Sequence, residues 1–184
     1  MENEVEDTEL RNWVKACLAL KCFKEGILPF IAKKCDEWYI HMISVVEAEC
    51  SSSYRCKSCD INRVEPQHAT KNNKCSDKRC NCKRNDQTPC NENGSCGVLY
   101  DLLKNEHVRC EPNWLNTKCD LWSDKQVGPW ELIKCFIFTT GYREKTSIAQ
   151  SDVTALIQIC ANNTKLRNAF STDFVHLDKV YDQF

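Results

Sequence analysis

Residues 8–49, TELRNWVKACLALKCFKEGILPFIAKKCDEWYIHMISVVEAE, carry the pattern that decides the fold class. Apolar residues recur here at intervals of three and four, which is the spacing of one face of an α-helix. The first stripe contains Leu10, Trp13, Val14, Cys17 and Leu18, and the second contains Ile31, Cys35, Trp38, Met42 and Val45. Gly26 favours the end of one helix, and Pro29 suits the first turn of the next. The stretch predicts a helical hairpin in which the thiols of Cys17 and Cys35 are buried.

Further helices are predicted downstream of residue 98. The residues that carry the helical spacing are Leu99, Leu102, Leu103 and Val108, then Trp130, Ile133, Phe136 and Ile137, then Val153, Leu156, Ile157 and Cys160, and finally Phe170, Phe174, Leu177, Tyr181 and Phe184. Pro129 opens the second of these helices and Gly141 ends it. Ser151 and Asp152 can cap the third. The fourth is expected to run to the last residue.

The composition limits the classes of function. The chain has 184 residues and a net charge of −1, so it lacks a global field that would attract nucleic acid or an anionic membrane. The first residues, MENEVED, are acidic and do not form the apolar segment of a secretory signal. No apolar run approaches the ~20 residues of a membrane-spanning helix. We therefore expect a cytoplasmic or nuclear protein without a membrane partner.

Residues 50–96 have a different composition. Apart from cysteine, they contain few sizeable apolar residues, so the segment cannot bury enough apolar surface to offset its chain entropy. It holds eight of the 15 cysteines, namely Cys50, Cys56, Cys59, Cys75, Cys80, Cys82, Cys90 and Cys96. Disorder is one interpretation, and the density of thiols favours the other, a cross-link through metal. The chain thus divides into a hairpin at 1–49, a Cys-rich insert at 50–119 and a C-terminal helical part at 120–184.

The spacing of the cysteines indicates structural zinc, with one or two ions. Zinc prefers four nitrogen or sulfur ligands in a tetrahedron, and a Cys-x₂-Cys turn supplies two of them. The first predicted site combines Cys56 and Cys59 with two of Cys75, Cys80 and Cys82, with His68 as a substitute ligand. The second combines Cys90, Cys96 and His107 with Cys110 or Cys119. Disulfides, free or redox-active thiols and an iron–sulfur cluster are the alternatives.

The sequence shows no catalytic constellation. Neither a phosphate-cradling glycine loop nor a G-x-S-x-G elbow is present, and no small-molecule substrate is evident. Residues 57–86 hold eight basic and four acidic residues, and the basic ones include Lys78, Arg79, Lys83 and Arg84. This excess is typical of a solvated polar loop. The alternative interpretation is a basic zinc module that follows a phosphate backbone.

Several motifs match a known family. They are Asn12-Trp13-Val14-Lys15, Lys24-Glu25-Gly26, Cys50-x₅-Cys56, Trp114-x₄-Cys119-x₂-Trp122, Trp130-Glu131-x₂-Lys134-x-Phe136, Gly141 and the stretch from Asp152 to Cys160. On these residues both ends of the chain resemble an uncharacterised animal protein family that is named after an open reading frame on the human X chromosome. The resemblance covers roughly 100 residues. It implies a helical fold whose C-terminal part is similar to a HEPN domain of an RNA-associated ubiquitin ligase.

The resemblance also implies RNA or innate-immunity partners. HEPN domains often carry an Arg-x₄₋₆-His motif that cleaves RNA in some members, but Arg167 and His176 are spaced too widely to match it. Our main hypothesis is a non-enzymatic, zinc-stabilised protein that binds an RNA or protein partner. One alternative is a HEPN-like ribonuclease whose motif lies beyond residue 184, so that 120–184 is the start of a truncated domain. The other is a secreted, disulfide-rich protein.

Overall fold

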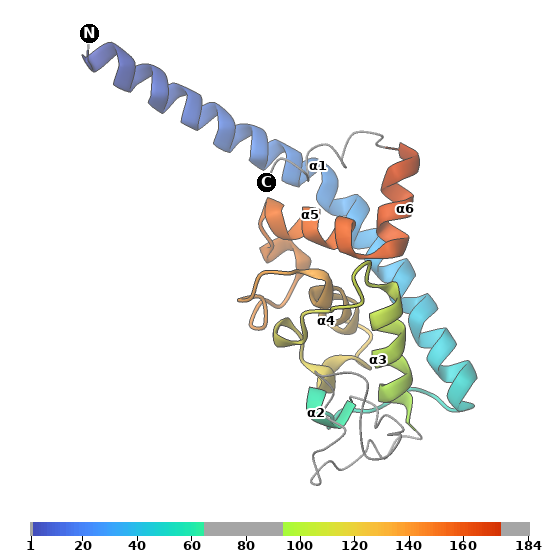
Figure 1. The fold of residues 1–184 in the computed structure, drawn as a ribbon. Helices are drawn as coiled ribbons and strands as arrows, with labels where there is room; N and C mark the ends of the chain where they lie inside the picture. Colours follow the sequence, from blue (N-terminus) through green and yellow to red (C-terminus); the bar gives the residue numbers. More distant parts are fainter. Residues whose placement is uncertain (1, 65–93, 174–184) are drawn as a thin grey trace.

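The structure, a computed structural model, describes residues 2–64 and 94–173 and confirms the mainly α fold class (Figure 1). The α-helices are α1 (Glu2–Cys50), α2 (Ile61–Val64), α3 (Ser95–Glu106), α4 (Gly128–Ile133), α5 (Val153–Asn162) and α6 (Thr164–Asp173). Four short 3₁₀ helices join them: η1 (Trp114–Asn116), η2 (Cys119–Leu121), η3 (Lys134–Phe136) and η4 (Ile148–Gln150). The described residues contain no strand, and a single antiparallel bridge pairs His107 with Asn163.

The predicted helical hairpin is wrong, because α1 is one continuous helix of 49 residues. Gly26 lies inside it, where glycine costs about 1 kcal/mol relative to alanine. Pro29 also lies inside it, where proline removes one backbone hydrogen bond at a cost of about 3 kcal/mol. Leu28 and Ile31, on either side of this proline, both pack against the core. That packing offsets the cost of both helix breakers and holds the helix in one piece.

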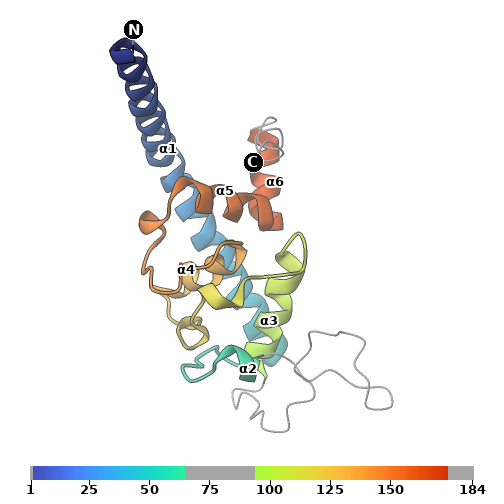
Figure 2. The same cartoon turned by 60° about the vertical axis from the view of Figure 1, so that its left-hand side comes forward.

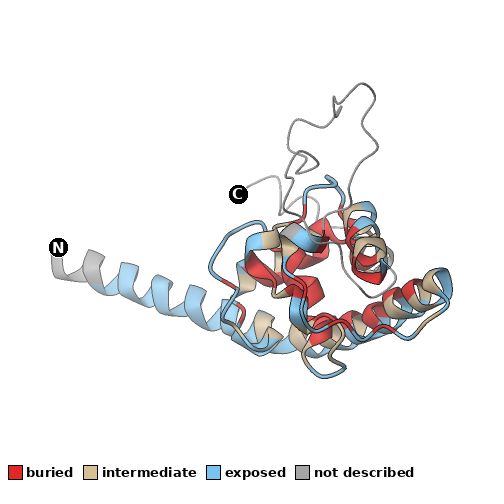
Figure 3. Ribbon diagram, turned by 90° about the horizontal axis from the view of Figure 1, so that it is seen from below, coloured by how far each residue is buried: buried red, intermediate tan, exposed pale blue. Residues whose placement is uncertain are grey.

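The two halves of α1 have different surroundings. Residues 7–23 are exposed, and this half projects away from the rest of the molecule (Figures 2 and 3). From Ile27 onward one face of the helix contacts the core, and α1 packs against α3, α4, α5 and α6. Cys35 is buried as expected, whereas Cys17 is exposed, because its position on the helix lies outside the part that the other elements cover.

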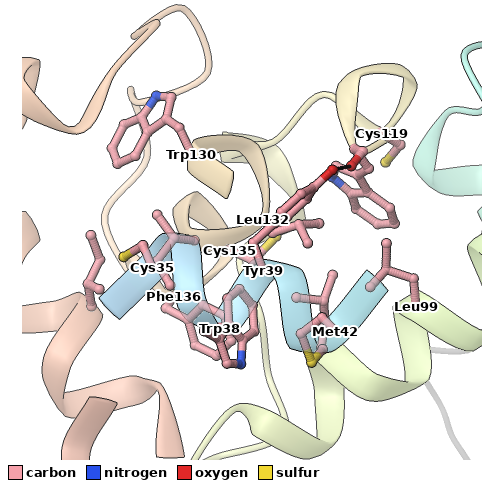
Figure 4. Packing of buried hydrophobic residues seen from close by; sticks show 14 of the residues in the cluster. Cys35, Trp38, Tyr39, Met42, Leu99, Cys119, Trp130, Leu132, Cys135 and Phe136 are labelled. Atoms are coloured by element: carbon pink, nitrogen blue, oxygen red, sulfur yellow. Dashed lines mark hydrogen bonds between the residues drawn. The ribbon is translucent and has the colours of Figure 1, made fainter. Parts of the chain in front are cut away.

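The hydrophobic core forms where the second half of α1 meets the C-terminal elements (Figure 4). The Trp38 ring contacts Phe136 edge to face, with their centroids 5.5 Å apart. The single proton of the Tyr39 hydroxyl is shared between the backbone oxygens of Trp122 (3.0 Å) and Asp124 (3.2 Å). Since the core draws buried residues from each of the three predicted segments, it connects α1 both to the insert and to the C-terminal part.

The later helices follow the predictions in part. Helix α4 begins with Pro129 in its first turn as predicted, but it ends at Ile133 and does not continue to Gly141. The Asn116 side chain accounts for the chain path after the helix, because its amide donates to the Ile137 oxygen at 2.9 Å and to the Thr139 oxygen at 2.8 Å. These carbonyl groups would otherwise accept bonds within a longer helix.

Helix α5 confirms its predicted cap, because the Asp152 carboxylate accepts a hydrogen bond from the Ala155 amide at 2.8 Å. The short helix predicted from Leu99 to Val108 is α3, which ends at Glu106. Helix α6 begins at Thr164, earlier than the predicted last helix, and residues 174–184 lie outside the described part of the chain. Within the described ranges, no helix combines the length and the hydropathy needed to cross a membrane.

Candidate metal centre

The side chains of Cys56, Cys59 and Cys96 lie close together within the buried cluster. The Sγ atoms of Cys56, Cys59 and Cys96 all lie within 4.8 Å of one another. The Sγ atoms of Cys56 and Cys59 are 3.3 Å apart. All three side chains are buried. This group, which we call the thiol cluster, can hold a metal ion, because each side chain offers one sulfur ligand toward a common point.

The thiol cluster joins two parts of the chain that are distant in sequence. Cys56 and Cys59 lie on the segment between α1 and α2, and Cys96 lies in the first turn of α3. Ser123 fixes the first segment, because its hydroxyl donates to the Cys56 oxygen at 2.8 Å. Gly94 precedes α3 with a φ of 78°, a left-handed conformation that glycine adopts readily. The cluster therefore links the end of α1 to the start of α3.

Burial keeps the Cys96 thiol neutral when no cation is present. It raises the pKa of the Cys96 thiol well above its ordinary value. It also raises the pKa of Tyr54, whose hydroxyl lies 3.4 Å from the Cys96 Sγ. A buried thiolate needs a nearby positive charge. A divalent metal ion that displaces the thiol protons would supply it.

Cys119 and His107, two further predicted ligands, do not belong to the thiol cluster. Cys119 lies in η2, and burial raises the pKa of its thiol, with a contribution from nearby Cys135 and a smaller one from Cys59. The His107 ring stacks on Phe136 at a centroid distance of 5.5 Å.

The Nδ1 atom of His107 accepts a hydrogen bond from the Arg109 amide at 3.1 Å. Burial lowers the pKa of His107, which favours the neutral ring that this contact requires. His107 therefore serves the packing of the loop after α3. Cys110, the alternative to Cys119 in the second predicted site, is exposed.

The structure groups the cysteines differently from the two predicted sites. Cys96, which we assigned to the second site, lies with Cys56 and Cys59 of the first. The other candidate ligands, Cys75, Cys80, Cys82, Cys90 and His68, lie outside the described residues. The basic residues Lys78, Arg79, Lys83 and Arg84 lie outside them as well.

A buried ion pair was missed at the sequence level. The Lys134 ammonium group lies 2.7 Å from a Glu131 oxygen, and both side chains are buried. Burial lowers the pKa of Lys134, and the hydrogen bond to Glu131 opposes that shift. The other Glu131 oxygen accepts from the Lys118 amide at 2.8 Å. The spacing of three residues within the Trp130–Phe136 motif was the signal that could have indicated this pair.

The polar and tryptophan residues around this pair form further hydrogen bonds in the described structure. The Trp122 indole donates to the Thr117 hydroxyl at 2.7 Å, and that hydroxyl donates to the Glu131 backbone oxygen at 2.7 Å. The Trp130 indole donates to the Lys145 oxygen at 2.6 Å. These residues hold the loops to α4, so the motif stabilises the C-terminal part of the core.

Comparison with protein-family models, with curated proteins and with solved structures finds no match for this chain.

Proposed function

We propose that this protein is a non-enzymatic binding protein whose Cys-rich segment is held by structural zinc. The observation that carries the proposal is the thiol cluster, in which Cys56, Cys59 and Cys96 are buried with their sulfur atoms within 4.8 Å of one another. Zinc binds thiolates at about 2.3 Å in a tetrahedron, and structural sites fill all four positions with protein ligands. Three of those positions correspond to the cluster.

The fourth ligand comes, under this proposal, from Cys75, Cys80, Cys82, Cys90 or Cys119. Cys119 is the one candidate among them that the structure describes, and it lies buried near Cys59. A site closed by a fourth thiolate leaves no position for an activated water, so its contribution is to folding and not to catalysis. Zinc thiolates also require reduced cysteines, which supports a cytoplasmic or nuclear location.

The buried polar groups support a structural role as well. His107 accepts a backbone hydrogen bond, and Glu131 and Lys134 pair with each other. In the described part of the chain these contacts tie His107, Glu131 and Lys134 into the packing of the core.

Zinc content is the measurement that tests the proposal. We expect one or two zinc ions per chain by native mass spectrometry of protein purified in reductant, and none after treatment with a chelator. Replacing Cys59 with serine should remove one ion. Cys160→Ala is the matched control, because Cys160 is a buried cysteine outside the cluster, and this variant should keep its zinc.

Single serine replacements at the five candidate positions would identify the fourth ligand by the loss of the same ion. A protein that carries no metal, with a mass lower by two protons for each cysteine pair, would contradict the proposal. It would support the disulfide-rich alternative instead.

The partner is an RNA or another protein, and the basic residues of the insert distinguish the two. If they bind RNA, replacing Lys78, Arg79, Lys83 and Arg84 together with glutamine should weaken binding to a single-stranded RNA. It should also reduce the slope of log affinity against log salt by about 0.7 for each lost phosphate contact. Fluorescence anisotropy over a salt titration measures both quantities.

The matched control for this variant replaces Lys33 and Lys125 with glutamine, because both are exposed lysines outside the insert. Affinity that does not change with salt, or that survives the fourfold replacement, would exclude RNA binding by this segment and leave a protein partner.

A further inference from the structure

The projecting half of α1 presents apolar side chains to solvent. Trp13 is 66% exposed and Leu10 is 60% exposed. The large exposed hydrophobic residues of this half are Leu10, Trp13, Val14, Leu18, Leu20 and Phe23. Single exposed apolar residues are ordinary, but a contiguous row on one element marks a contact surface.

Part of this row continues the face of α1 that packs against the core. Eighteen residues make about five full turns of an α-helix, so residues separated by eighteen positions lie in line along it. Leu10 is in line with Leu28, and Trp13 is in line with Ile31, which is fully buried. Leu20 is likewise in line with the buried Trp38, so Leu10, Trp13 and Leu20 extend the core-facing side of α1 past the elements that cover it (Figure 3). Leu18 and Phe23 lie beside this side, in line with the exposed Asp36 and His41. An exposed apolar face of this kind is typical of a surface that binds another protein segment.

The charges along the same helix indicate which occupant fits. Residues 2–9 contain five acidic residues and no basic residue, and residues 10–24 contain four basic residues and no acidic residue. The segment is therefore complementary in charge to its own sequence read in the opposite direction. A parallel pair of such helices would place the two acidic blocks beside each other, which is unfavourable.

We propose that this half of α1 pairs antiparallel with the same segment of a second copy of the chain. With the two-fold axis between Trp13 and Val14, these two residues face each other, and Leu10 faces Cys17. Residues 2–9 of one copy then lie along residues 18–25 of the other, which include Lys21. The apolar row forms the centre of the contact, and the opposite charges fix its direction.

The charged side chains in this region are held only weakly within one chain. Lys21 lies 3.8 Å from Glu25, and Arg11 lies 3.5 Å from Asp7, with all four side chains more than 60% exposed. Exposed pairs of this kind contribute little, so they can exchange for contacts across the dimer. Lys24 is different, because it donates to the Ala149 oxygen at 2.9 Å. Lys21 is therefore the residue with which to test the direction.

Sedimentation of the full, zinc-loaded chain over a range of concentrations tests the pairing. We expect a monomer–dimer equilibrium, and we expect Trp13→Ala to raise the dissociation constant by about tenfold or more. The replacement should not impair folding, because Trp13 is largely exposed within the single chain. Ile40→Ala is the matched control, since Ile40 is 67% exposed on α1 outside the row, and it should leave the dissociation constant unchanged.

Sedimentation in the presence of reductant excludes a disulfide-linked dimer, which the exposed thiols of Cys17 and Cys22 could otherwise form.

Lys21→Gln tests the direction of the helices. In the antiparallel pair Lys21 faces acidic residues, so its neutralisation should weaken the dimer, and added salt should weaken it too. In a parallel pair Lys21 would face its own copy, and both changes would strengthen the dimer. Strengthening would overturn the antiparallel arrangement.

A chain that stays monomeric at all concentrations while retaining its zinc would overturn the dimer and leave the metal centre intact. A chain that forms the dimer but carries no zinc would overturn the metal centre and leave the dimer intact.

Discussion

Lys134 has no exposed side-chain surface, and its ammonium group lies 2.7 Å from Glu131. It also donates to the Arg143 oxygen at 3.0 Å. Removing two charges from water is costly, and these contacts offset that cost only while both partners are present. The pair therefore makes the packing around α4 sensitive to a change in either residue.

We expect Lys134→Met to lower the free energy of unfolding by about 3–5 kcal/mol, because it leaves the Glu131 carboxylate buried without its cation. Urea denaturation measures this. Glu144→Gln is the control, since it breaks the 2.7 Å pair with Lys118 at a carboxylate that is 79% exposed, and it should cost about 1 kcal/mol or less. A Glu131→Gln/Lys134→Met variant as unstable as the sum of its single variants would show that the two residues act independently.

The candidate metal centre shows how far single residues can be predicted from the sequence. The Cys-x₂-Cys spacing indicated that Cys56 and Cys59 lie together, and the structure places their sulfur atoms 3.3 Å apart. The contribution of Cys96 could not be predicted, because it depends on α3 packing beside the segment that follows α1. His107 has the residue type and the spacing of a zinc ligand. In the structure its ring stacks on Phe136, a tertiary contact that the sequence pattern does not predict.

At the scale of elements, α1 shows why helix boundaries are hard to predict. Gly26 and Pro29 are both breakers by their local preferences, and together they predicted a turn. The apolar spacing before and after these two residues indicates which face of a helix is buried. It does not indicate that the residues around Gly26 and Pro29 pack against the same core. The tertiary packing of Leu28 and Ile31 decides the outcome in favour of one helix.

This continuity predicts the effect of changing Gly26. A Cβ at this position would meet no atom within 4 Å, and the residue lies inside α1, so Gly26→Ala should stabilise the protein by about 0.5–1 kcal/mol and raise its helicity. Circular dichroism with thermal unfolding measures both. If Gly26 instead belonged to a hairpin turn, the replacement would be neutral or destabilising.

Gly128→Ala provides the opposite comparison. A Cβ there would lie 2.7 Å from the Trp122 oxygen and 2.8 Å from the Tyr39 hydroxyl, so it should destabilise the protein.

At the scale of the whole molecule, the sequence predicted the mainly α class and the caps of single helices, but not how the parts assemble. The three segments into which we divided the chain contribute buried residues to one core, and Trp38 of α1 contacts Phe136 of η3. Composition identified residues 50–96 as unable to form a core alone. It did not show that Tyr54, Cys56 and Cys59 are buried with the core residues, because that burial depends on the surfaces of α1 and α3.

Because α1 is continuous, its length sets the distance between the exposed row and the segment that carries Cys56 and Cys59. At a rise of 1.5 Å per residue, Trp13 lies about 55 Å along the helix axis from Cys50, where the segment that carries Cys56 and Cys59 begins. A hairpin would have folded these two regions back on each other. A continuous helix acts as a spacer instead, so whatever binds the exposed row is kept apart from the thiol cluster by the length of the helix between them. Inserting residues near position 25 would change that length.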